Sequence, residues 1–230
     1  MDANQIRLWS ENHKKLTGII LKPHEHNAAV ELFLSQHSLL HASEMSHSAV
    51  ATLEDDLFSD LREETIRKYP VKVPGTKNSI AWHIWHITRI EDMTMNVLVH
   101  NQQQVFHAGE WPERLKVEVA HSGNEMPEDE IASLSAHIDI AELLAYRMEV
   151  GRKTREVVSS LRQGDFKMKV AAERIQALRE QGAVKEEASW LLDYWGGKTI
   201  AGLILMPATR HLFMHLNKSI RIKEKLQKIR

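Results

Sequence analysis

Apolar residues recur at helical spacing along most of the chain. Between residues 24 and 44 they are Ala29, Val30, Phe33, Leu34 and Leu40. This spacing places apolar side chains on one face of a helix. Glycine (10 residues) and proline (6 residues) are sparse, which favours long helices over a turn-rich β fold. We therefore expect a mainly helical protein.

The same pattern predicts how the helices are organised. Ser79 or Asn78 is a good cap for a helix, and Pro127 followed by three acidic residues is a good helix start. One stretch, LKVEV at 115–119, instead alternates like a short strand. Four main helices are expected near 26–46, 79–100, 128–161 and 206–228, with shorter helical pieces at 52–68 and within 163–198. The predicted fold is an all-α four-helix bundle with additional short helices, forming a single domain over residues 1–230.

Composition narrows the classes of function. The chain has 30 basic and 31 acidic side chains and a net charge of −1, which argues against a nucleic-acid-binding surface. Cysteine is absent, so any metal ligands are nitrogen or oxygen atoms. No apolar run reaches the roughly 20 residues that span a bilayer, and the first residues have no apolar segment of signal-peptide type. We expect a soluble cytoplasmic protein without membrane or nucleic-acid partners.

Two histidine-rich stretches contain most of the chemical signal among the 14 histidines. In RHLFMHL, His211 and His215 are four residues apart, so both rings point the same way on a helix and can chelate one ion. In SIAWHIWHITRIED, His86 shares an inward helix face with Trp82 and Ile90. A bundle can bring these three histidines together. Three imidazoles would leave a position on a divalent ion open for water or substrate, as in catalytic sites.

Spacing alone does not select this set of three. His37 and His41 in SQHSLLHA are also four residues apart, and His37 shares a face with Val30 and Phe33. His41 is therefore a minor candidate for the site. His83 can be a fourth ligand, a general base or a buried hydrogen-bonding residue, and crowding around one ion favours the last role.

The other polar residues near His86 are expected to have structural roles. Arg89 can bind an anionic substrate, but pairing with a nearby acid is the more common role. Glu91 and Asp92 point away from His86 by helical geometry, so we expect them to cap, pair or contact neighbouring helices. Trp190, Tyr194 and Trp195 can line a pocket, although aromatic residues more often pack in a core.

The segments WHIWHITRIED and RHLFMHL resemble the DinB-like superfamily, which is related to the bacillithiol S-transferases. That family has an inward histidine on its second bundle helix, in a W-x-x-x-H-[IL]-x-x-x-E-like context, and an H-x3-H pair on its last long helix. His86 matches the first position, and His211 and His215 match the pair. The stretch AELLAYRMEVGRKTREVVSSL resembles the third helix. The similarity covers about 26–226, and the insertion at about 163–198 departs from the family pattern.

The resemblance implies a four-helix bundle, often a homodimer, that holds a divalent metal ion (Zn, Ni or Fe) on His86, His211 and His215. It also implies a metal-dependent enzyme of thiol S-transferase or hydrolase type with a small-molecule substrate, such as a low-molecular-weight thiol. No residue beyond these ligands is identified as catalytic. The alternative is a metal-free helical binding or stress-related protein, in which the histidines make core hydrogen bonds.

Overall fold

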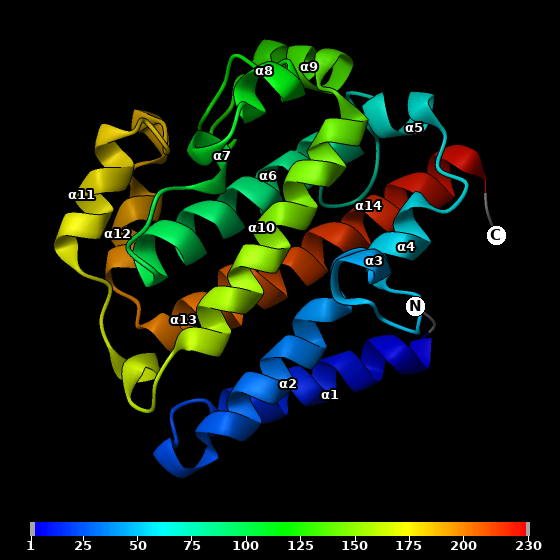
Figure 1. Ribbon diagram of the computed structural model, residues 1–230. Coiled ribbons are helices and arrows are strands. Elements are labelled where there is room, and N and C mark those ends of the chain that lie inside the picture. Colours follow the sequence, from blue (N-terminus) through cyan, green and yellow to red (C-terminus); the bar gives the residue numbers. More distant parts are fainter. Residues whose placement is uncertain (1–2, 229–230) are drawn as a thin grey trace.

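Helices account for all the regular secondary structure of the computed structural model, which describes residues 3–228 (Figure 1). Within these residues the extended pairings are two isolated bridges, Val73 with Thr76 and Lys169 with Thr199. The longer helices are α1 (Ala3–Ile19), α2 (His26–Ser38), α6 (Ile80–Asp92), α9 (Glu128–His137), α10 (Ile140–Ser160), α11 (Ala172–Glu180) and α14 (Leu212–Gln227). The shorter ones are α3 (Ser43–Ser46), α4 (Leu53–Phe58), α5 (Glu63–Arg67), α7 (Val105–Ala108), α8 (Trp111–Leu115), α12 (Trp190–Gly196) and α13 (Ile200–Leu205). The order also includes two π-helical segments, η2 (Met93–Val99) and η5 (Met206–His211). It is completed by three 3-10 turns, η1 (Pro23–Glu25), η3 (Asp165–Lys167) and η4 (Glu186–Ala188).

The central helix of the bundle is α6 with its extension η2, every residue of which is buried. It packs against α10 on one side and against η5 and α14 on another, while α2 contacts α10 and η5. Helix α1 lies outside this bundle and packs along α2 (Figure 1). This arrangement confirms the predicted all-α bundle with additional short helices. Because α6 is buried on all sides, its polar side chains contact only neighbouring parts of the protein. Its histidines and acidic residues therefore lie inside the bundle.

Two of the predicted long helices are interrupted. The helix expected over 26–46 ends at Ser38, and α3 follows after a turn, so His41 lies beyond the end of α2. The helix expected over 128–161 breaks at Ile138, where the backbone leaves the helical region. The Asp139 carboxylate then accepts a hydrogen bond from the backbone N–H of Glu142 at 3.3 Å and starts α10. Apolar periodicity continues across both breaks, so it does not reveal them.

Shorter segments also differ from the prediction. The helix expected over 52–68 is divided into α4 and α5. The strand suggested by LKVEV is wrong, because Leu115 completes α8 and Lys116 adopts a left-handed conformation with φ 56°. At the start of α6, by contrast, Ser79 accepts a hydrogen bond from the Trp82 N–H at 3.0 Å, which confirms the predicted cap. Pro207 lies in η5, between α13 and α14, and a π-helical turn accommodates its missing N–H without ending the helix.

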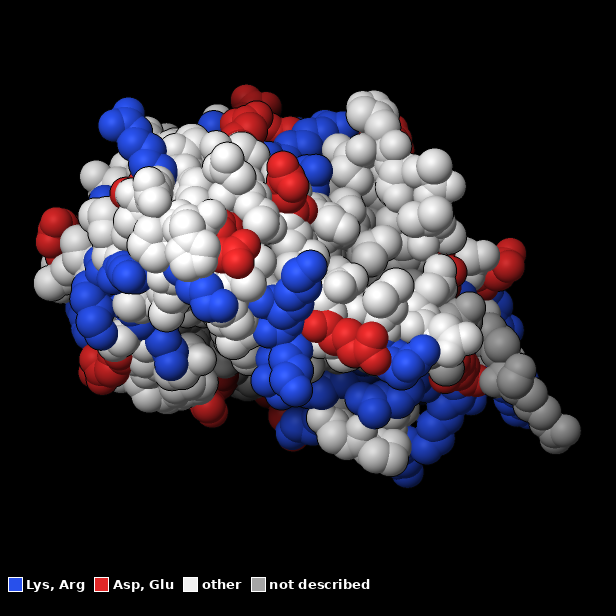
Figure 2. Space-filling model, turned by 90° about the horizontal axis from the view of Figure 1, so that it is seen from below, with Lys and Arg blue, Asp and Glu red and all other residues white. Residues whose placement is uncertain are grey.

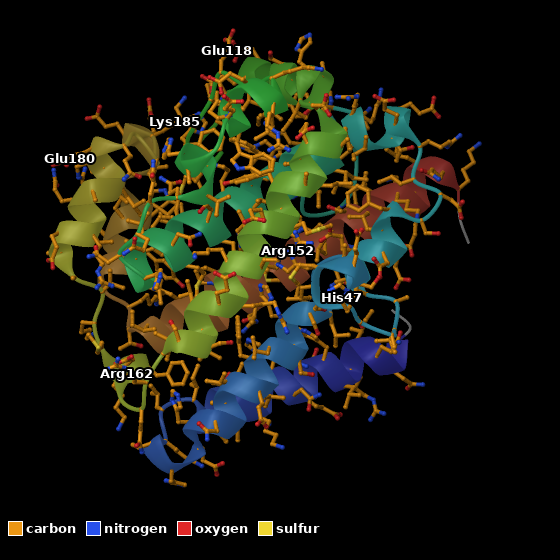
Figure 3. The ribbon with its side chains drawn as sticks, in the orientation of Figure 1. His47, Glu118, Arg152, Arg162, Glu180 and Lys185 are labelled. Carbon is orange, nitrogen blue, oxygen red and sulfur yellow. The ribbon has the colours of Figure 1, made fainter. Side chains whose placement is uncertain are left out.

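The segment 163–198 forms a side layer of the molecule. It begins next to Arg162 at the end of α10 and includes α11 and α12, with Glu180 and Lys185 at its outer edge (Figure 3). On the side seen from below, basic side chains are interspersed with acidic and neutral ones (Figure 2). Among the helices of residues 3–228, none is long and apolar enough to cross a membrane.

Candidate metal centre

The tautomer of His86 is determined by its hydrogen bond. Its Nδ1 lies 2.6 Å from the backbone carbonyl of Ser122. A carbonyl oxygen only accepts, so His86 Nδ1 donates and its Nε2 keeps a lone pair in the neutral ring. A metal-binding imidazole has this arrangement, in which the second nitrogen donates to a carbonyl or carboxylate that orients the ring.

The structure brings His86, His211 and His215 together. One potential ligand atom from each ring lies within 4.8 Å of the other two. His86 Nε2 and His211 Nε2 are 3.2 Å apart, and His211 Nδ1 is buried with no hydrogen-bond partner among residues 3–228. Two nitrogens bound at about 2.0–2.1 Å to a tetrahedral ion are separated by about 3.3 Å. The observed separation therefore suits two ligands of one ion.

His83 forms a hydrogen bond with His215 of this cluster. Its Nδ1 and His215 Nδ1 lie 2.9 Å apart, and its Nε2 lies 2.9 Å from Thr76 Oγ1. When His83 donates to Thr76 and accepts from His215, the Nε2 of His215 keeps its lone pair. His83 is thus a buried hydrogen-bonding residue, which was the favoured of its three predicted roles.

Burial keeps these imidazoles neutral near pH 7. It lowers the pKa of His86 to about 4 and that of His83 to about 3. Burial, with the neighbouring His86 as the next cause, also holds the pKa of His211 and of His215 well below 6.5. Neutral imidazole is the form that binds a metal ion.

A pocket of about 200 Å³ opens onto this cluster. His86 and His211 contribute to its wall, and Asn124 adds a polar group. The other side chains that line it are largely apolar and come mainly from α12 and η5: Ile90, Trp190, Leu191, Tyr194, Trp195, Met206 and Pro207. The inserted segment 163–198 therefore forms one side of the pocket. Its three aromatic residues line the pocket, although core packing was the more common use expected for them, and Trp195 is also buried in the core.

The remaining polar residues of α6 have the structural roles expected of them. Arg89 is buried, and its guanidinium lies 3.4 Å from the Asp92 carboxylate. Asp92 also accepts from the Tyr146 hydroxyl at 2.6 Å and from the Val105 N–H at 2.9 Å. Glu91 contacts His37 at 2.7 Å, on the side of α6 that α2 covers. The pairing of His37 and His41 with Glu91 was not predicted, because no pattern along the chain shows that α2 meets α6 there.

The helical bundle and its inward histidine cluster define a class of protein. The family model of the DinB superfamily matches residues 47–217. The chain belongs to the DinB superfamily, as its two histidine-containing motifs indicated. Among curated proteins, none matches this chain.

Proposed function

We propose that this protein is a divalent-metal-dependent enzyme, with His86, His211 and His215 as the ligands of the ion. The main support is that His86 and His211 belong both to the cluster of converging rings and to the wall of the pocket. A substrate in the pocket would thus lie next to the ion. The 3.2 Å separation of the Nε2 atoms of His86 and His211 also suits two ligands of one ion.

The histidines would hold the ion with one side open. When bound, a divalent ion of this kind makes a coordinated water or thiol more acidic and orients it for attack. The carbonyl of Ser122 and the ring of His83 would keep His86 and His215 in the orientation for binding. Imidazole ligands suit Zn, Ni and Fe.

The pocket indicates what kind of molecule reacts. Its volume of about 200 Å³ suits a small molecule, and its apolar wall suits an apolar group. Trp190 and Tyr194 are half-exposed at its edge, where they can contact an entering ligand. We propose a small-molecule substrate that coordinates the ion through a group such as the thiol of a low-molecular-weight thiol. The reaction would be thiol transfer or hydrolysis.

Metal analysis of untagged protein tests the proposal. Wild-type protein should contain a divalent ion that the double variant His211→Ala, His215→Ala loses, while its circular dichroism stays helical. The exposed His24→Ala is a matched control and should retain the ion. Full retention of metal by the double variant would contradict the proposal. It would point to the pair His37 and His41 as the ligands, whereas wild-type protein without stoichiometric metal would favour the metal-free alternative.

The family resemblance also leads us to propose a homodimer, and the cytoplasmic location expected from the sequence stays a prediction. Light scattering coupled to size-exclusion chromatography measures the first directly. A mass of one chain across the micromolar range would contradict it.

A further inference from the structure

A second group of metal-binding side chains lies on another side of α6. His37, near the end of α2, and His41, in the turn that follows, both face Glu91 of α6. All three side chains are buried, with exposed fractions of 0%, 1% and 0%. One potential ligand atom from each lies within 4.8 Å of the other two. This group shares no residue with the cluster of His86, His211 and His215.

Hydrogen bonds account for the contact between His37 and Glu91 but not for the contact between His41 and Glu91. His37 Nε2 lies 2.7 Å from Glu91 Oε1 and donates to it. His41 Nε2 and Glu91 Oε2 are 3.2 Å apart, yet their geometry makes no hydrogen bond, and neither atom has another partner in the part of the chain that the structure describes. A buried carboxylate oxygen and a buried ring nitrogen without partners are both unfavourable. Two ligands of one ion are expected to lie at this distance without a hydrogen bond between them.

The charges around the group are compatible with a bound cation. Arg147 is the nearby basic residue, and its guanidinium is paired with the Glu54 carboxylate at 2.7 Å. Burial lowers the pKa of His41 to about 3, so its ring is neutral and has a lone pair to offer. The Glu91 carboxylate is therefore buried beside the neutral ring of His41, in a place where a divalent ion would balance its charge.

Helix α10 is shaped to fit the ring of His41. Gly151 lies inside α10, where glycine is normally unfavourable. A Cβ atom added at this position would lie 2.7 Å from His41 Nδ1. The glycine thus allows the imidazole to lie directly against the backbone of α10, which holds His41 toward Glu91.

We propose that His37, His41 and Glu91 form a second divalent-metal site, closed to solvent and structural in role. Two imidazoles and a carboxylate are ligands that zinc and related ions accept. His37 and His41 precede residue 47, where the match to the family begins, whereas Glu91 lies within it. His47 itself ends α3, on the loop that leads into the bundle (Figure 3). The ion would fasten the helices before this loop to the central helix.

The number of bound ions tests this proposal. Untagged protein, stripped with a chelator and reloaded with Zn²⁺, should bind two equivalents per chain after gel filtration. Glu91→Gln should lower this number to one. It is nearly isosteric and its amide oxygen can still accept from His37. His41→Gln should have the same effect, and the exposed His24→Gln should retain two equivalents.

The same measurement separates this proposal from the proposed function. One equivalent that disappears in His211→Ala, His215→Ala but persists in Glu91→Gln would overturn the second site and leave the enzyme proposal intact. One equivalent with the opposite behaviour would overturn the enzyme proposal and support the second site. If Glu91→Gln loses its helical circular dichroism, His41→Gln and the wild-type count decide the result. Two equivalents that persist in His41→Gln would contradict the proposal.

Discussion

The two histidine clusters use the same short pattern along the chain but are built differently. The cluster of His86, His211 and His215 opens onto a pocket, and its rings are oriented by Ser122 and His83. The cluster of His37, His41 and Glu91 is closed and contains its own carboxylate. A pair of histidines four residues apart therefore does not by itself predict a kind of site. The kind of site depends on whether the rings border a pocket or are covered by another helix.

The charge of each cluster follows from this difference. The open cluster consists of neutral rings, so an ion bound there would keep its full positive charge for a substrate. In the closed cluster the Glu91 carboxylate would neutralise part of that charge. Because a pocket opens onto the first cluster and the second is buried, a catalytic role suits the first and a structural role the second.

Acid should have the largest effect on stability, because buried neutral histidines occur in both clusters. In metal-free protein, His86 has a pKa of about 4 when folded and about 6.5 when unfolded. The unfolded chain therefore binds more protons between these values, and the free energy of unfolding falls as the pH drops from 6.5 to 4. At about 1.4 kcal/mol per pKa unit, His86 alone accounts for about 3 kcal/mol. Urea denaturation with chelator, at intervals across this range, measures the fall.

The closed cluster should add a second loss at lower pH. Burial raises the pKa of Glu91, but its contacts and hydrogen bonds with His41 and His37 lower it more, so the net folded pKa lies below the ordinary 4.5. The stability that this carboxylate provides is present above pH 4.5 and is lost below it. His86→Gln should reduce the fall between pH 4 and 6.5 by about 3 kcal/mol and leave the fall from the other buried histidines in place. An unchanged profile in that variant would contradict the assignment.

Removing the support of the open cluster should have the next largest effect. His83→Leu deletes the hydrogen bond to His215 Nδ1 while nearly keeping the side-chain volume. The affinity of the open site for Zn²⁺ should fall about 10–100-fold, as for other residues that orient a ligand. Competition with a chromophoric chelator measures the change. Equal affinities in His83→Leu and wild type would show that His83 does not orient His215.

A methyl group at Gly151 should disturb the closed cluster and leave the open one intact. Gly151→Ala places a Cβ atom 2.7 Å from His41 Nδ1, and such overpacking costs about 1–3 kcal/mol. Gly18→Ala in α1 is the matched control, because no atom lies within 4 Å of its added Cβ. It should stabilise the protein by up to about 1 kcal/mol. Thermal unfolding of both variants gives the comparison, and equal shifts would contradict it.

Truncation at the edge of the pocket should have the smallest effect on stability. Trp190 is 50% exposed, so Trp190→Ala should change the free energy of unfolding by about 0.5 kcal/mol or less. The metal content should remain that of wild type, whereas a small apolar dye should bind more weakly. Loss of metal in this variant would mean that α12 supports the ligands rather than the substrate.

The sequence predicts the open cluster better than the closed one for a physical reason. His86, His211 and His215 lie on inward faces of helices whose order matches a known family. The contact of His37 and His41 with Glu91 depends on where α2 meets α6, and helical periodicity describes each helix only by itself. His41 also lies beyond the end of α2, so helical spacing does not describe its position.

Helix existence was predictable, whereas helix ends were predictable only where a side chain marks them. Ser79 caps α6 as expected, because its hydroxyl satisfies the Trp82 N–H. Asp139 caps α10 in the same way, but apolar periodicity continues across the break and hides it. No capping side chain marks the start of α3. The pocket depends on where the inserted segment 163–198 folds back.

Trp82 gives the molecule an optical reporter of its own. Its indole stacks on the His86 ring, with centroids 4.6 Å apart and planes inclined by 10°. An ion that draws electron density from that imidazole would change the emission of the adjacent indole, whereas filling of the site at Glu91 would leave this stack undisturbed. Because the chain has six tryptophans, the part of the intrinsic fluorescence change that Trp82→Phe abolishes would follow the loading of this centre in real time, without any added label.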